Sequence, residues 1–171
     1  MAKIEFHRND RPTVGIELEL GLVDAKTMAL TSSFGLLYGR LIGEGKHEGI
    51  KDSLKPELMQ CVLEINSCVC DTIADAERDL RAKLEIVESA CDAIGLRLWW
   101  GATHPFSTWQ DQRITPDERY LQLVNLLQEM ARRLVTFGLH IHVGSQITDL
   151  EPLTRAAAAL VALPRSRNSP S

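Results

Sequence analysis

Strict alternation of apolar and polar residues over positions 13–23 constrains the fold of this chain more than any other feature. Every second residue is apolar, and the series comprises Val14, Ile16, Leu18, Leu20 and Leu22. Glu17 and Glu19 fall on the opposite face, together with glycines. A period of two with branched aliphatic residues is typical of a β-strand that buries one face. The segment therefore predicts a strand that carries two carboxylates on its polar face.

Further strands and helices follow along the chain. We predict strands over 58–66, 96–100 and 139–144, and helices over 34–42, 73–94 and 116–137. Thr72 with Asp75 is typical of a helix start, and Gly95 suits a helix end. Long helices or loops separate the strands, so the pattern favours an α+β domain over a β-sandwich.

Length and composition exclude several classes of protein. The 171 residues suffice for about one domain, and 25% of them are charged, which is ordinary for a globular chain. The net charge of −4 and the pI of about 5.7 argue against a nucleic-acid partner, since such proteins carry basic patches. No run of about 20 apolar residues is present, so we expect no membrane span. The first residues lack the apolar core of a signal peptide, so we expect a cytoplasmic protein.

Several reactive motifs are missing. The cysteines Cys61, Cys68, Cys70 and Cys91 contain no C-x-x-C pair, so we expect buried apolar side chains or free thiols in place of a zinc site. Neither Cys61 nor Ser107 lies in the sequence context of a nucleophile elbow. Gly45-Lys46-His47 is not a Walker loop, because Arg40 stands where the first glycine belongs and no Ser or Thr follows the lysine.

Three of the predicted strands place chemistry-bearing residues on one face. The pairs are Glu17 with Glu19, Glu64 with Asn66, and His140 with His142. Any single pair is typical of a solvated strand face. Together they are the ingredients of a metal site, and oxygen-rich ligands favour Mg²⁺ or Mn²⁺ over zinc. A metal-dependent hydrolase that uses the two histidines is an alternative interpretation.

Five segments carry a family resemblance. They are Thr13–Asp24, Glu57–Asn66, Thr103–Phe106 followed by Trp109, Arg119-Tyr120, and Gly138–Gly144. In order and approximate spacing they resemble the ATP-dependent carboxylate-amine ligases of the glutamate–cysteine ligase type 2 family, over roughly residues 12–149. Ser67-Cys68 departs from the Thr-Gly that this family commonly shows after Glu-Ile-Asn.

The resemblance implies a fold similar to that of glutamine synthetase. In such a fold a mostly antiparallel sheet, with helices packed on one face, forms a funnel that holds divalent cations. The metal ligands that the resemblance implies are Glu17, Glu19, Glu64, His140, His142 and Glu57. Strict alternation puts Glu57 and Glu64 on opposite faces of one strand. Glu57 therefore precedes the regular strand, a bulge intervenes, or Glu57 is not a ligand.

The reaction that the resemblance implies uses ATP with Mg²⁺ or Mn²⁺. A substrate carboxylate attacks the γ-phosphate, and an amine such as that of cysteine then displaces phosphate from the acyl phosphate. The implied partners are small molecules, whose identity the sequence does not reveal. Thr103–Phe106 either shapes the substrate pocket or forms a rigid loop packed on Trp109. Arg119 either binds a substrate carboxylate or makes a salt bridge on the helix surface.

The resemblance fades after about Asp149, and family members are considerably longer. We therefore expect residues 1–149 to be the N-terminal part of a ligase domain and 150–171 to be a partial helix with a disordered tail, as a truncated or frameshifted gene would give. The chain is then a ligase with weak glutamate–cysteine ligase activity, or alternatively an inactive fragment that binds metal, nucleotide or another chain. An incomplete sheet exposes an edge and an apolar face, so we also expect a homo-oligomer.

Overall fold

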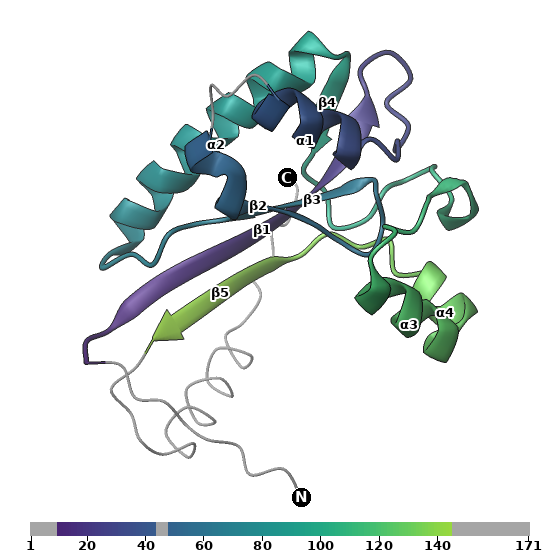
Figure 1. The fold of residues 1–171 in the computed structure, drawn as a ribbon. Helices are drawn as coiled ribbons and strands as arrows, with labels where there is room; N and C mark the ends of the chain where they lie inside the picture. The colour runs from purple at the N-terminus through teal and green to yellow at the C-terminus, as the bar shows by residue number, and fades with distance from the viewer. Residues whose placement is uncertain (1–9, 44–47, 145–171) are drawn as a thin grey trace, which may run out of the picture. The chain divides into compact units, whose positions relative to one another are not determined.

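The computed structural model describes residues 10–43 and 48–144 (Figure 1). The strands are β1 (Thr13–Asp24), β2 (Leu54–Pro56), β3 (Val62–Asn66), β4 (Leu96–Trp99) and β5 (Leu139–Gly144). The helices are α1 (Phe34–Gly43), α2 (Ile73–Ala93), α3 (Glu118–Leu127) and α4 (Glu129–Arg132), with 3₁₀ turns η1 (Glu48–Ser53) and η2 (Trp109–Asp111). The Gly45-Lys46-His47 sequence and the expectations for residues 1–9 and 145–171 lie outside the described residues.

The sheet is built around β1, the strand that the alternation predicts. Its order is β2-β3-β1-β4, and β5 also pairs with β1. The pairs β1–β3, β1–β4 and β2–β3 are antiparallel, and the arrows of β1 and β5 in Figure 1 lie side by side and point in opposite directions. The predicted α+β fold with a mostly antiparallel sheet is therefore confirmed. The strand predicted over 58–66 begins only at Val62, because the chain turns from β2 into β3 before that residue.

The register of β1 against β3 separates the two faces of the sheet. Glu19 lies opposite Glu64, and Leu20 lies opposite Leu63. Because successive side chains point to opposite faces, the two carboxylates share one face and the two leucines share the other. One face is therefore acidic and the other apolar.

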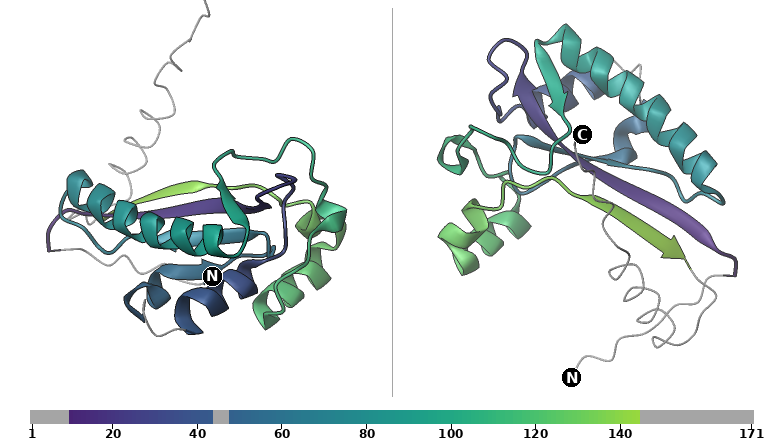
Figure 2. Two further views of the ribbon diagram at one scale, coloured as in Figure 1. Left: turned by 90° about the horizontal axis from the view of Figure 1, so that it is seen from above. Right: turned by 180° about the vertical axis from the view of Figure 1, so that it is seen from behind.

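The helices α1 and α2 cover the apolar face (Figure 2). The buried core between them and the sheet includes Leu20, Leu22, Leu37, Leu41, Leu63, Ile65, Leu80 and Val87. As the sequence predicts, Thr72 is the N-cap of α2, and its Oγ1 accepts a hydrogen bond of 3.1 Å from the Asp75 N–H. Gly95 follows α2 with a φ of 72°, a conformation that favours glycine. This packing confirms that helices cover one face of the sheet.

A buried lysine ties α2 to the end of β3. The Nζ of Lys83 donates hydrogen bonds to the backbone oxygen of Asn66 at 2.8 Å and to Asp79 Oδ2 at 2.7 Å. Only 8% of the Lys83 residue is exposed, so the ammonium group depends on these partners for its solvation. The lysine thereby holds the strand end that carries Glu64 and Asn66.

The helix predicted over 116–137 is wrong in its extent. It begins at Glu118, where the Asp117 side chain accepts from the Arg119 N–H at 2.9 Å, and it breaks at Gln128, whose φ is 53°. The break turns α4 so that Ala131 packs with Tyr120 and the rest of a small cluster. Met130 and Leu134, which fall within the predicted helix, are consequently exposed.

Two further expectations concern cysteines and membranes. Cys61, Cys70 and Cys91 are buried free thiols, as predicted, while Cys68 is an exposed one. Burial raises the pKa of the Cys61 and Cys91 thiols to about 12, which keeps both protonated and unreactive near neutral pH. No helix within the described ranges is long and apolar enough to cross a membrane.

Packing on the apolar face predicts which substitutions lower the free energy of unfolding. Leu63 is fully buried, so we expect Leu63→Ala to lower the free energy of unfolding by about 2–5 kcal/mol through lost burial and a residual cavity. Leu126 on α3 is 78% exposed, so Leu126→Ala is the matched control and changes it by no more than about 0.5 kcal/mol. Urea unfolding measures both. Equal effects of the two substitutions would contradict the assignment of the core.

Candidate metal centre

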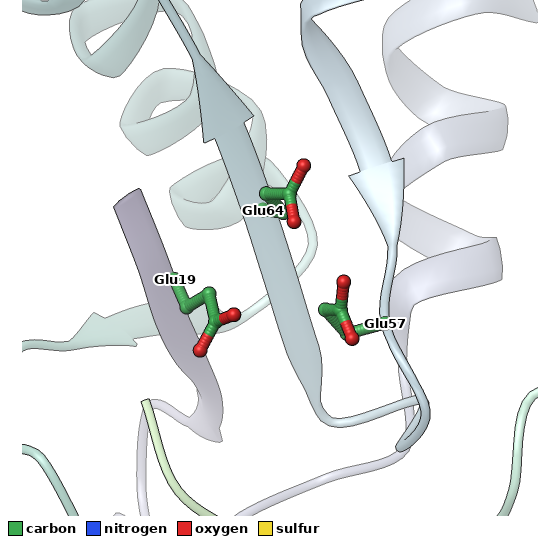
Figure 3. Close-up of side chains that lie close together, drawn as sticks. All are labelled: Glu19, Glu57 and Glu64. Atoms are coloured by element: carbon green, nitrogen blue, oxygen red, sulfur yellow. The ribbon is translucent and has the colours of Figure 1, made fainter. Parts of the chain in front are cut away.

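Three glutamates gather on the acidic face of the sheet. Glu19 of β1, Glu64 of β3 and Glu57, just beyond the end of β2, each offer one carboxylate oxygen, and these atoms lie within 4.8 Å of one another (Figure 3). We call this group the acidic cluster. Glu64 is buried and the other two are partly buried. Sequence positions far apart are thus brought together by strand pairing.

Strand pairing also explains how Glu57 reaches the cluster. Lys55 of β2 lies opposite Glu64, so Lys55 and Glu64 share a face, and the second residue after Lys55 returns to that face. Glu57 therefore approaches Glu64 from the neighbouring strand. The conflict with strict alternation disappears, because Glu57 precedes β3 and the two glutamates do not belong to one strand.

A hydrogen-bond donor orients each carboxylate of the acidic cluster. The Asn66 side chain donates to Glu64 Oε1 at 2.8 Å, the Gly138 N–H donates to Glu19 Oε2 at 2.7 Å, and the Leu58 N–H donates to Glu57 Oε2 at 3.2 Å. Each of these bonds occupies one oxygen of its carboxylate. Polar contacts from neighbouring residues therefore hold the cluster in place.

Electrostatic repulsion acts within the acidic cluster. Burial, and then the proximity of Glu64 and Glu19, raise the pKa of Glu57 above its ordinary value of 4.5. Among residues 10–43 and 48–144, no Lys or Arg forms an ion pair with any of the three carboxylates. A divalent cation would remove this repulsion, and carboxylate oxygens are the ligands that Mg²⁺ and Mn²⁺ prefer.

The remaining predicted ligands form a second group. Ring N–H groups of His140 and His142 on β5 donate to Glu17 Oε2 at 3.2 and 3.3 Å. Burial acts to raise the pKa of Glu17, but the hydrogen bonds from His142 and His140 outweigh it and lower the pKa. The six predicted ligands therefore lie in two groups, in one of which the histidines contact a carboxylate. Their role as metal ligands stays a prediction.

Asn66 is a further residue of this face, which the sequence placed on the polar side of the strand but not among the ligands. It lies opposite Glu17, and its side-chain nitrogen donates to Glu64. Its Oδ1 is buried and has no hydrogen-bond partner in the described part of the chain. A carboxylate can only accept, so the bond to Glu64 fixes which amide atom is the free oxygen. This oxygen adds one more acceptor between the two groups. Asn66 could have been found from the sequence, because it lies two residues after Glu64 and therefore on the same face of the strand.

Hydrogen bonds and ring contacts hold the Thr103–Phe106 loop. The His104 Nδ1 accepts from the Ser107 N–H at 3.1 Å, so its Nε2 carries the proton and donates to the Met28 oxygen at 3.0 Å. The ring packs edge-on against Trp99 and Phe106. The loop thus packs on Trp99 of β4, and a contact with Trp109 stays a prediction. Its part in a substrate pocket stays a prediction.

Ser67 and Arg119 have structural partners that the sequence did not foresee. The Ser67 Oγ accepts from the Ile16 N–H at 2.9 Å, so the departure from the family pattern ties β1 to the end of β3. The Arg119 guanidinium lies 4.4 Å from the centre of the Tyr120 ring and donates to its hydroxyl. None of the ion pairs of the described residues involves Arg119, so its salt bridge stays a prediction.

Comparisons with known proteins identify relatives of this chain. The family model described as "Glutamate-cysteine ligase family 2 (GCS2)" matches residues 13–164. The "Putative glutamate–cysteine ligase 2-3" of Nocardioides sp. is 37% identical over 142 residues, which are 83% of this chain and 37% of that protein. The "Putative glutamate–cysteine ligase 2" of Gloeobacter violaceus is 36% identical over an alignment of 172 positions, which covers 98% of this chain and 45% of that protein.

A solved structure has a similar fold. The 2.0 Å crystal structure of glutamate–cysteine ligase from Francisella tularensis in complex with AMP matches with a TM-score of 0.64 at 14% identity. The match covers 90% of this chain and 30% of that chain. This chain thus spans less than half the length of the curated relatives named above and of this structure.

The raised pKa of Glu57 predicts how the stability of the fold depends on pH. An acid whose pKa is higher in the folded state destabilises the fold as pH rises above its unfolded value of 4.5. We expect Glu57→Gln, which keeps a carbonyl acceptor for Leu58, to be more stable than the wild type near neutral pH. This advantage should vanish as the pH falls to 4.5. Chemical unfolding in metal-free buffer at several pH values measures the difference.

The control for this prediction is Glu85→Gln, on the exposed surface of α2 and outside the acidic cluster. It should show no comparable gain near neutral pH. A Glu57→Gln advantage that grows on acidification would overturn the assignment of like-charge repulsion.

Proposed function

Because this chain belongs to the glutamate–cysteine ligase family 2, we propose that it supplies the N-terminal part of an ATP-dependent carboxylate-amine ligase with divalent-cation sites on the acidic face of its sheet. The reaction would join an amino-acid carboxylate to an amine, with glutamate and cysteine as the pair that the relatives' names suggest. The cation would be Mg²⁺ or Mn²⁺. The AMP complex of the Francisella tularensis enzyme supports an adenine nucleotide as the second substrate.

The acidic cluster is the observation that carries this proposal. Its carboxylates lie close enough to share one ion, each is oriented by a donor, and no basic side chain of the described residues neutralises them. Partly buried like charges are costly unless a cation or a proton compensates them. The unpartnered oxygen of Asn66 adds an acceptor of the kind that hard cations bind. The residues present therefore fit a divalent cation.

In the proposed reaction the residues of this chain bind and orient. Glu19, Glu57 and Glu64 would hold one cation, and Glu17 with His140 would contribute to a second site. When bound, such cations supply the positive charge that offsets the phosphates of ATP. The substrate carboxylate attacks the γ-phosphorus, ADP leaves, and the amine then displaces phosphate from the acyl phosphate. Positioning and charge compensation, without covalent catalysis by the protein, is the chemistry that this face offers.

A second candidate is a chain that binds the cation without turning over substrate. The side chains of His140 and His142 are 54% and 62% exposed, so their group is open on the side away from Glu17. A cation held there would lack enclosing ligands from the described part of the chain. Binding and turnover therefore need separate measurements.

Cation binding is the first test. We expect Glu19→Gln and Glu64→Gln each to weaken Mn²⁺ binding by at least about tenfold, because losing a direct ligand costs no less than losing its supporting hydrogen bond. Glu85→Gln on α2 is the matched control and should bind as the wild type does. Titration followed by the electron paramagnetic resonance signal of free Mn²⁺ measures the affinity. Unchanged affinity in both cluster variants would contradict the site.

Turnover is the second test. We expect ADP release from Mg-ATP with glutamate and cysteine to be slow in the wild-type chain and lost in Glu17→Gln and Glu64→Gln. A coupled ADP assay measures it. Release that both variants retain would refute the metal assignment. Mn²⁺ binding without any ADP release in the wild type would support the second candidate instead.

A further inference from the structure

A pocket with walls of opposite charge adjoins the acidic cluster. Its volume is about 490 Å³, and its lining residues are Glu57, Arg119, Tyr120, Gln122, Leu123 and Leu126. Glu57 belongs both to this pocket and to the acidic cluster. A molecule that fills the pocket therefore extends from the guanidinium of Arg119 to the edge of the candidate cation site.

The guanidinium of Arg119 is held by Tyr120 and forms no ion pair among the described residues. It stacks on the Tyr120 ring at 4.4 Å and donates to the Tyr120 hydroxyl, which in turn donates to the Pro56 oxygen at 3.0 Å. Tyr120 is buried, so this chain of contacts ties the arginine to the residue that precedes Glu57. Arginine has five N–H donors, and in the described residues none of them meets a carboxylate.

Such an arginine is suited to a carboxylate ligand. The planar guanidinium matches a carboxylate with two parallel hydrogen bonds, and stacking reduces the side-chain entropy that binding would otherwise cost. Leu123 and Leu126 give the pocket an apolar side that fits a short aliphatic stem.

We propose that Arg119 binds the carboxylate of a dicarboxylic amino acid that does not react, and so directs its other carboxylate toward the acidic cluster. This inference rests on the proposed function, because the ligase reaction defines which carboxylate reacts. For glutamate, the held group is the α-carboxylate and the reacting group is the γ-carboxylate. Arg119 then distinguishes the dicarboxylic amino acid from the amine substrate, which has a single carboxylate.

The test compares two ligands that differ only in the held group. γ-Aminobutyrate is glutamate without its α-carboxylate. We expect the wild-type chain with saturating Mn²⁺ to bind glutamate at least about tenfold more tightly than γ-aminobutyrate, in line with a charge-assisted bidentate contact. Arg119→Gln should abolish this preference by weakening glutamate alone, and Arg119→Lys should retain part of it. Isothermal titration calorimetry measures each affinity.

Controls separate this inference from the proposed function. Arg81→Gln, on the exposed face of α2 where Arg81 pairs with Glu77 at 2.8 Å, should keep the full preference. Mn²⁺ binding should be the same in all these arginine variants. A wild type without preference for glutamate, or a preference that Arg119→Gln retains while Mn²⁺ still binds, would overturn the role of Arg119 alone. Failure of Mn²⁺ binding in the wild type would overturn the proposed cation site.

Discussion

The antiparallel pairing of β1 with β3 is the constraint on which the rest of the structure depends. It places Glu19 opposite Glu64 on one face and Leu20 opposite Leu63 on the other. A slip by one residue would move the carboxylates of one strand into the core beneath α2, so burial of the leucines also specifies the acidic face. Ser67 strengthens this register at one end, because its backbone N–H and its Oγ both bond to the backbone of Ile16. The core and the site are therefore two consequences of one pairing.

The same pairing has an electrostatic cost. Three carboxylates are held close together by donors from β3, from the turn after β2 and from the residue before β5. Repulsion among them opposes folding, while the apolar face packed against α1 and α2 favours it. The fold thus maintains an arrangement that its own charges disfavour, which is expected where binding of a ligand supplies the compensation.

The sequence predicted those features that depend on local pattern. Alternation identified β1 and the histidine strand, and it placed Glu19 and Glu64 each on the polar face of its own strand, because a period of two reports a strand with one buried face. That the two strands are neighbours came only from the structure. It could not place Glu57, since β2 is only three residues long and leaves no periodic signal. It also missed the break at Gln128, because the apolar spacing continues through it while tertiary packing of Ala131 ends the helix. The family resemblance named Glu57 as a metal ligand, which stays a prediction, and the place of Glu57 beside Glu19 and Glu64 came only from the strand pairing.

The two faces of β5 differ in chemistry, since one carries histidines and the other carries exposed apolar side chains. One face presents His140 and His142 to Glu17, while Leu139 and Ile141 on the other are 60% and 59% exposed. Leu139 also borders a hollow of about 580 Å³ with Ile16, Leu84 and Trp100, so the apolar surface continues from β5 to α2. Large exposed apolar surface is unfavourable in water and typically marks an interface. Because β5 carries both faces, whatever polypeptide buries its apolar side also restricts the motion of the two histidines. The exposed apolar face of β5 therefore belongs to the same strand that presents His140 and His142 to Glu17.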